Sequence, residues 1–267
     1  MAFRVAEYLP GVYHIEDALG VCMTLLTGSK QALLVDTGYG FENVRALVRD
    51  LTDRPLTVLL THGHHDHALG ARWFDDVYLH PLDLPVYEQY TGEEQRRKVI
   101  ENAHGKGIGI QEDEYMRAKV PKPRDLIPGD VDLGDMKARV LHLPGHTPGS
   151  CTVFVPERSL MLTGDNWNPC TWLFFKEALP VGKYRRSLHA MLEYPFRHVL
   201  CPHSFRLMEQ DMIRDFAEAL TDEVLESAMP VDTGAAQGVR TAQVRLPHGQ
   251  ILVFDVDKYI REKEDGR

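Results

Sequence analysis

Paired cysteines and long apolar runs are both missing from this sequence of 267 residues. The four cysteines, Cys22, Cys151, Cys170 and Cys201, contain no CxxC pair, which argues against a disulfide framework or a cysteine-based zinc site. No uncharged run approaches the roughly 18 residues that a transmembrane helix needs. The N-terminus lacks the basic start and apolar run of a signal peptide. We therefore expect free, mostly buried thiols, a cytoplasmic location and no membrane partner.

Positive charge is also scarce, since 30 lysines and arginines stand against 39 acidic residues and give a net charge of −9. This balance provides no general attraction to nucleic acid or to anionic membranes. Repeats and low-complexity tracts are absent as well. An apolar fraction of 43% and a charged fraction of 26% are ordinary for a soluble globular enzyme. We expect a small-molecule substrate and no nucleic-acid partner.

Short apolar runs between turn residues predict an α/β protein. The chain is predicted to form a single domain over residues 1–267, with an inserted, polar helical lid at about 82–120 and a C-terminal hairpin at about 239–257. The order of strands followed by helices occurs twice along the sequence. This order favours a domain of two halves whose sheets pack against each other. The predicted strands are 21–27, 32–35, 57–60, 137–143, 151–155, 160–162 and 199–200. One predicted helix begins near Phe41, and two others cover 183–193 and 205–229.

Histidine and aspartate are concentrated in the segment from Thr61 to His67, directly after a predicted buried strand. Side chains two apart along an extended segment point the same way, so His62 and His64 can converge on one metal ion. Asp66 and His67 begin a turn and can address a second position. Imidazole and carboxylate together suit zinc, iron or manganese. A solvated histidine-rich loop is the alternative, but four of 13 histidines within six positions is improbable by chance.

Three further residues of ligand type follow predicted strands. His146 lies in a turn rich in proline and glycine, Asp165 follows an apolar run, and His203 follows Cys201-Pro202. Because strand ends on one edge of a sheet can present ligands together, all three can join the histidine-rich segment.

These segments resemble the metallo-β-lactamase-fold superfamily, whose pattern is His-x-His-x-Asp-His, then a histidine in a Gly-His-Thr-x-Gly turn, then an aspartate and a last histidine. The resemblance runs from about Val12 to Ser204. It implies a four-layer αβ/βα sandwich of two mixed β-sheets with outer helices. It also implies that His62, His64 and His146 hold a first metal, that Asp66, His67 and His203 hold a second, and that Asp165 bridges the two.

Two positions near the motif receive other roles from the resemblance. Asp36, after the predicted strand 32–35, matches a family position that holds ligands in place, although an Asp-Thr-Gly at a strand end can also be only a turn. His65 stands in the variable position of the motif and is expected to point away from the metals.

The pattern favours a glyoxalase-II-like or lactonase-like branch of the superfamily. Zinc β-lactamases with a cysteine ligand do not match, because the second-metal position offers Asp66 and His67. Flavin-linked diiron proteins do not match either, because they have a glutamate in place of one histidine of the motif. The long stretch between His67 and His146, which holds the predicted lid, counts against assigning either named activity of the favoured branch.

The implied chemistry is hydrolysis by two divalent metal ions, zinc first, with iron or manganese as alternatives. Coordination lowers the pKa of water toward about 7, so a metal-bound hydroxide can attack an ester, thioester, lactone or amide of a small molecule. Asp66 and Asp165 are the predicted catalytic residues. A different class remains open, a mononuclear iron oxidoreductase similar to persulfide dioxygenases. A non-catalytic binding module is the weakest reading, because no ligand of the motif is missing.

The aromatic segment after Asp165 is the candidate for a substrate wall. Trp167, Trp172, Phe174 and Phe175 are predicted to line an apolar pocket beside the metals. Packing of these rings against the lid or a partner chain is an equal alternative, and the lid and this segment offer a contact for a homodimer.

Overall fold

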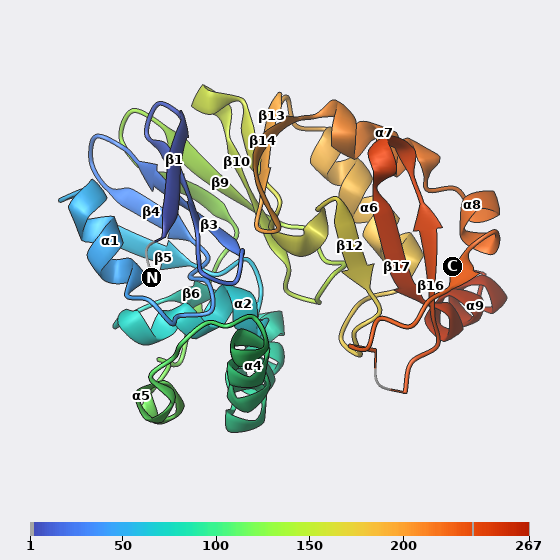
Figure 1. Cartoon of the computed structure of the whole chain (residues 1–267). Helices are drawn as coiled ribbons and strands as arrows, with labels where there is room; N and C mark the ends of the chain where they lie inside the picture. Colours follow the sequence, from blue (N-terminus) through green and yellow to red (C-terminus); the bar gives the residue numbers. More distant parts are fainter. Residues whose placement is uncertain (1–2, 237, 267) are drawn as a thin grey trace.

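The computed structural model describes residues 3–236 and 238–266. The first half of these residues forms a mixed sheet in the order β1-β2-β3-β4-β5-β6-β7 (Figure 1). Neighbours from β1 to β4 are antiparallel, whereas β4 to β7 run parallel. The strands are β1 (Arg4–Leu9), β2 (Val12–Glu16), β3 (Cys22–Thr27), β4 (Ala32–Val35), β5 (Leu56–Leu59), β6 (Tyr78–Leu79) and β7 (Arg124–Asp125).

A second mixed sheet, in the order β14-β13-β11-β10-β9-β8, packs on the first. Its strands are antiparallel apart from the parallel pair β11 and β13. They are β8 (Gly129–Asp132), β9 (Lys137–His142), β10 (Cys151–Val155), β11 (Leu160–Leu162), β13 (His198–Cys201) and β14 (Ser204–Glu209). The predicted α/β sandwich of mixed sheets is confirmed.

The last two long strands of the described residues pair antiparallel and belong to neither of these sheets. They form part of a third sheet, in the order β12-β17-β16-β15, which the sequence did not reveal. Its strands are β12 (Cys170–Leu173), β15 (Met229–Pro230), β16 (Thr241–Arg245) and β17 (Ile251–Asp255). Part of the aromatic segment after Asp165 is therefore a strand, paired in parallel with β17.

Helices cover the outer faces and fill the segment for which a lid is predicted. That segment contains α3, α4 and α5, of which α4 and α5 are seen below the first sheet in Figure 1. The α-helices are α1 (Val44–Leu51), α2 (His65–Ala68), α3 (Leu84–Tyr90), α4 (Glu93–Gly105), α5 (Glu112–Arg117), α6 (Val181–Leu192), α7 (Asp211–Ala219), α8 (Asp222–Glu226) and α9 (Val256–Glu264). Short 3₁₀ helices are η1 (Leu69–Trp73), η2 (Pro81–Asp83), η3 (Pro156–Arg158), η4 (Gly164–Asn166) and η5 (Pro247–Gly249).

Alternation along the central strands separates the core into layers. Successive side chains of a strand point to opposite faces. In β4, Leu33 and Val35 join the core between the two large sheets, while Leu34 packs toward α1. In β11, Leu160 and Leu162 face the same inner core, while Met161 faces α6 and α7. Both faces are buried, so these strands read as continuous apolar runs.

The predicted helix over 205–229 is wrong at its start. Residues Ser204–Glu209 form β14, and helix begins only with α7. Good helix formers such as Leu207 and Met208 are drawn into the sheet because β14 pairs with β13, with Met208 opposite Val199. Tertiary pairing thus overrides local propensity.

Two expectations about composition can be compared with the described residues. Their cysteines are all free, and Cys22, Cys151 and Cys201 are buried while Cys170 is exposed. None of the helices within these residues is long and apolar enough to cross a membrane.

Two tryptophans near the site provide a stability test of this core. Trp167 is fully buried and donates its indole N–H to Gln250 Oε1 at 3.0 Å, whereas Trp172 is 36% exposed. Trp167→Ala is expected to lower the free energy of unfolding by about 3–5 kcal/mol, because it leaves a large cavity and an unpaired amide. The matched control Trp172→Ala is expected to lower it by less than about 1 kcal/mol. Urea unfolding measures both, and equal losses would contradict the assignment of Trp167 to the core.

Candidate metal centre

The histidine-rich segment leaves the sheet at the carboxyl end of β5. His62 and His64 stand in the connection, and a tight turn into α2 directs Asp66 and His67 to a different position. Close packing requires glycine at position 63, between His62 and His64, because a Cβ there would lie 2.5 Å from the backbone nitrogen of Tyr87 in α3. The segment from His62 to His67 thus packs against α3, the first helix of the predicted lid.

Three histidines converge on one point. His62 Nε2 lies 3.1 Å from His64 Nδ1, and His146 Nε2 lies 2.9 Å from the same atom. All three side chains are buried, with exposed fractions of 3% or less. Two nitrogen lone pairs this close together repel unless a proton or a metal ion lies between them, and three imidazoles are a common zinc donor set.

The opposite nitrogen of each ring is held by the protein. His62 Nδ1 lies 3.0 Å from Thr61 Oγ1, and His64 Nε2 lies 2.6 Å from Glu177 Oε1. His146 Nδ1 lies 2.8 Å from the backbone oxygen of Trp172. If each of these nitrogens donates, the nitrogen facing the cluster keeps its lone pair, which is the usual arrangement around a metal-binding histidine.

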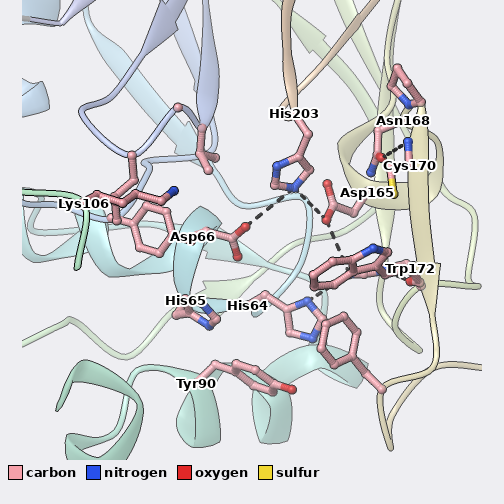
Figure 2. A pocket seen from close by; sticks show the side chains of 17 residues that line it. His64, His65, Asp66, Tyr90, Lys106, Asp165, Asn168, Cys170, Trp172 and His203 are labelled. Atoms are coloured by element: carbon pink, nitrogen blue, oxygen red, sulfur yellow. Dashed lines mark hydrogen bonds and ion pairs between the residues drawn. The ribbon is translucent and has the colours of Figure 1, made fainter. Parts of the chain in front are cut away.

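A second cluster lies beside the first and consists of Asp66, His67, Asp165 and His203. Their candidate ligand atoms lie within 4.8 Å of one another. His203 Nε2 is 3.1 Å from Asp165 Oδ2 and 3.6 Å from Asp66 Oδ2, as the dashed lines in Figure 2 show. Mixed imidazole and carboxylate donors suit zinc, iron or manganese.

Asp165, carried by η4, lies between the two clusters. Its Oδ2 is 3.6 Å from His146 Nε2 of the first cluster, and its Oδ1 is 3.5 Å from His67 Nε2 of the second. Both Asp165 Oδ1 and His67 Nε2 are buried without a hydrogen-bond partner. Buried polar atoms without partners are costly unless something binds them, so the residues fit a pair of metal ions.

Asp36 connects both clusters from behind. It follows β4 in a left-handed conformation, with φ of 65°, and its carboxylate is buried. Oδ1 accepts from Thr61 N at 2.7 Å, while Oδ2 accepts from Thr61 Oγ1 and His67 Nδ1, each at 2.9 Å. The strained backbone therefore aims one carboxylate at His67 of the second cluster and at Thr61, whose hydroxyl contacts His62 of the first.

The charges of the two clusters differ. Burial lowers the pKa of His62 well below its usual value, and burial together with His64 lowers the pKa of His146 to about 4. Burial would also lower the pKa of His67, but Asp66, Asp165 and Asp36 raise it well above its usual value. The pKa of His203 is raised in the same way, mainly by Asp165. Positive charge is thus disfavoured on His62 and His146 and favoured by the carboxylates on His67 and His203.

Two carboxylates that sequence reasoning missed hold this arrangement. Glu177 contacts His64, and although burial opposes it, the hydrogen bond from His64 lowers the pKa of Glu177 to about 2. Asp83, which is fully buried, accepts from Gly63 N at 2.8 Å, Thr147 Oγ1 at 2.8 Å and Gly149 N at 2.6 Å. It joins the two ligand-bearing loops. Neither residue stands in a motif, so no signal in one sequence could find them.

A cavity of about 410 Å³ opens beside the clusters (Figure 2). Trp172 and Phe175 line it, and so do Tyr39, Tyr90 and Lys106, which the sequence does not single out. His65 lies in neither cluster, as expected, but its ring stacks on Tyr90 and also lines the cavity.

The predicted wall is wrong at two positions. Trp167 is packed in the core between α6 and the third sheet and does not reach the cavity. Phe174 is also buried, and it lines a neighbouring cavity instead.

Comparison with known proteins places this geometry in a family. The profile of the metallo-beta-lactamase superfamily matches residues 17–203. The probable metallo-hydrolase YqgX of Bacillus subtilis is 32% identical over 143 residues, which cover 52% of this chain and 63% of YqgX. The acyl-coenzyme A thioesterase MBLAC2 of Homo sapiens is 28% identical over 156 residues, which cover 53% of this chain and 56% of MBLAC2. The chain thus matches less than two thirds of either relative's length.

Solved structures agree with the sequence match. The metallo-beta-lactamase family protein TTHA1429 from Thermus thermophilus shares the fold, with a TM-score of 0.59 and 23% identity, over 82% of this chain and 81% of TTHA1429. TTHA1623, solved in a di-iron-bound form, is 29% identical with a TM-score of 0.52, over 72% of this chain and 91% of TTHA1623. The profile match covers more than half of the sequence, and the chain therefore belongs to the metallo-beta-lactamase superfamily.

Proposed function

We propose that this enzyme is a binuclear hydrolase that cleaves an ester, thioester, lactone or amide bond of a small molecule. The observation that carries the proposal is the pair of adjacent clusters with Asp165 between them and two buried, partnerless ligand atoms facing inward. A single metal ion would leave one of these clusters unsatisfied. Zinc is the proposed metal, because the first donor set is three imidazoles.

The residues of the two clusters would have separate roles in binding metal and moving a proton. His62, His64 and His146 would hold one ion, and Asp66, His67 and His203 the other, with Asp165 shared between them. When bound, two such ions activate water and polarise a carbonyl oxygen. Asp66 Oδ2 borders the cavity and is placed to accept a proton from the attacking water. The rings of Trp172 and Phe175 exclude bulk water from one side.

Two relatives support narrower choices. MBLAC2 is an acyl-coenzyme A thioesterase, which favours a thioester among the four bond types. TTHA1623 has a di-iron-bound form, which keeps iron as an alternative to zinc.

The competing function is a mononuclear iron oxidoreductase similar to persulfide dioxygenases. Metal analysis of protein purified without added metal separates the two. About two zinc ions per chain, with turnover in a panel of ester, thioester, lactone and amide substrates, support hydrolysis. One iron per chain with oxygen uptake on a persulfide would replace this proposal with the oxygenase.

Removing a proposed ligand is expected to remove activity without unfolding the chain. His64→Ala and Asp165→Ala each delete a donor to a cluster, and turnover is expected to fall by more than about 100-fold, beyond the loss typical of residues that only orient ligands. The metal content per chain should fall as well. His248→Ala, at a surface ion pair with Asp215, is the control and should keep both. Unchanged turnover in the metal-quantified ligand variants would contradict the assignment.

The contact between Glu177 and His64 predicts a milder effect. Glu177→Ala frees the ring of His64 and is expected to weaken metal affinity by about 10- to 100-fold. Competition with a chromophoric chelator measures the affinity. Glu88→Ala, an exposed glutamate on α3, is the matched control. Equal affinities for the two variants would show that Glu177 does not orient the ligand.

Acid is expected to release the two metals in sequence. The raised pKa values of His67 and His203 mean that protons compete with metal at the second cluster as the pH falls through the neutral range. The lowered pKa of His146, about 4, delays this competition at the first cluster. Dialysis from about pH 8 to about pH 5 should take the metal content from two to one per chain. Loss of both metals in a single step would refute this order.

A further inference from the structure

One cation borders the cavity beside the clusters. Lys106 is the single lysine or arginine among the described residues that line it. Within the described part of the chain it forms no ion pair, whereas Lys98 on the same helix pairs with Glu94 at 2.8 Å. Lys119 and Lys183 also form no ion pair within the described residues, so what distinguishes Lys106 is its place beside this cavity.

The helix alone explains only part of this placement. Lys106 follows the last residue of α4 as its C-cap, where positive charge is favoured by the helix dipole. At the flanking Gly105 and Gly107 an added Cβ would meet nothing within 4 Å, so the backbone on both sides of the lysine borders open space. Its side chain nevertheless lines the cavity on the side of Asp66 (Figure 2).

The opposite side of the cavity has a different character. In Figure 2, Trp172 and Lys106 lie on opposite sides of Asp165 and His203. Trp172 is backed by Phe175, with ring centroids 6.1 Å apart. One side therefore offers an aromatic surface and the other a single positive charge, with the metal clusters between them.

Electrostatics decides which chemical group fits beside Lys106. Of the carboxylates that line the cavity, Asp66 and Asp165 both belong to the second cluster, so neither is free to neutralise the lysine. A further cation beside bound metal ions is repelled unless an anion lies between them. One lysine without a group of backbone N–H donors suits a carboxylate better than a phosphate, which usually recruits several donors.

We propose that Lys106 binds a carboxylate of the substrate, while Trp172 and Phe175 contact an apolar part across the metal centre. The substrate class is then an acyl ester or thioester that carries a free carboxylate on one side of the scissile bond. This inference rests on the proposed hydrolase function and narrows its substrate. Lys106 is a specificity-determining residue, and the cleavage itself does not require it.

The test compares an anionic with a neutral substrate in metal-loaded enzyme. The probes are 4-nitrophenyl hemiglutarate, which carries a carboxylate, and 4-nitrophenyl butyrate, which does not. Lys106→Met is expected to reduce kcat/KM for the anionic probe by about five- to tenfold, mostly through KM, and to leave the neutral probe unchanged. Lys106→Arg should restore most of the preference. High salt should weaken the preference in wild type, because the contact is partly exposed.

Lys98→Met is the matched control, since it removes the same charge from the same helix. Retained preference in Lys106→Met, or an equal loss in Lys98→Met, would overturn the proposal. Circular dichroism checks that both variants are folded.

A binding measurement separates this inference from the function on which it rests. Calorimetry compares glutarate with butyrate as ligands of the metal-loaded protein. If no probe is hydrolysed but Lys106→Met still weakens glutarate binding selectively, the hydrolase proposal fails and the carboxylate site stands. If glutarate binding is unaffected by Lys106→Met, the carboxylate site is refuted whatever the enzyme cleaves.

Discussion

The metal centre depends on the hydrogen bonds that the carboxylate of Asp36 accepts. This carboxylate receives hydrogen bonds from Thr61 and from His67, and Thr61 in turn contacts His62. One buried side chain thereby orients a histidine in each cluster. Its position requires a left-handed backbone at the end of β4, and the core on both faces of that strand stabilises the strained turn. The packing of the sheet and the chemistry of the site meet at this residue.

Much of the fold and most of the candidate ligands could be predicted because they leave local signals. Buried strands give apolar runs, and the ligands stand in a dense motif at strand ends. The ligand roles themselves remain predictions, although the structure brings all seven residues into two adjacent groups. Asp36 could be proposed only through the resemblance, since Asp-Thr-Gly after a strand also describes an ordinary turn.

The residues that could not be predicted act through distant contacts. Glu177 lies 113 positions from His64, and Asp83 lies 64 positions from Thr147, so no local spacing records either pair. Trp167 and Trp172 look alike in the sequence, yet one fills the core and the other faces the cavity. That difference arises from β12 joining a third sheet. Ser204–Glu209 shows the same limit, because its pairing with β13 outweighs its helical composition.

Asp83 has a consequence for how this chain can diverge. It stands where the segment from α3 to α5 begins, and it ties that point to the loops that carry His62, His64 and His146. The start of the segment is therefore fixed to the ligands, whereas in its far part an added Cβ at Gly105, Gly107 or Gly109 would meet open space. Insertions or substitutions there can alter which molecules enter the cavity and leave the coordination geometry intact. Local sequence drift in this part can thus change the shape of the cavity separately from the metal ligands.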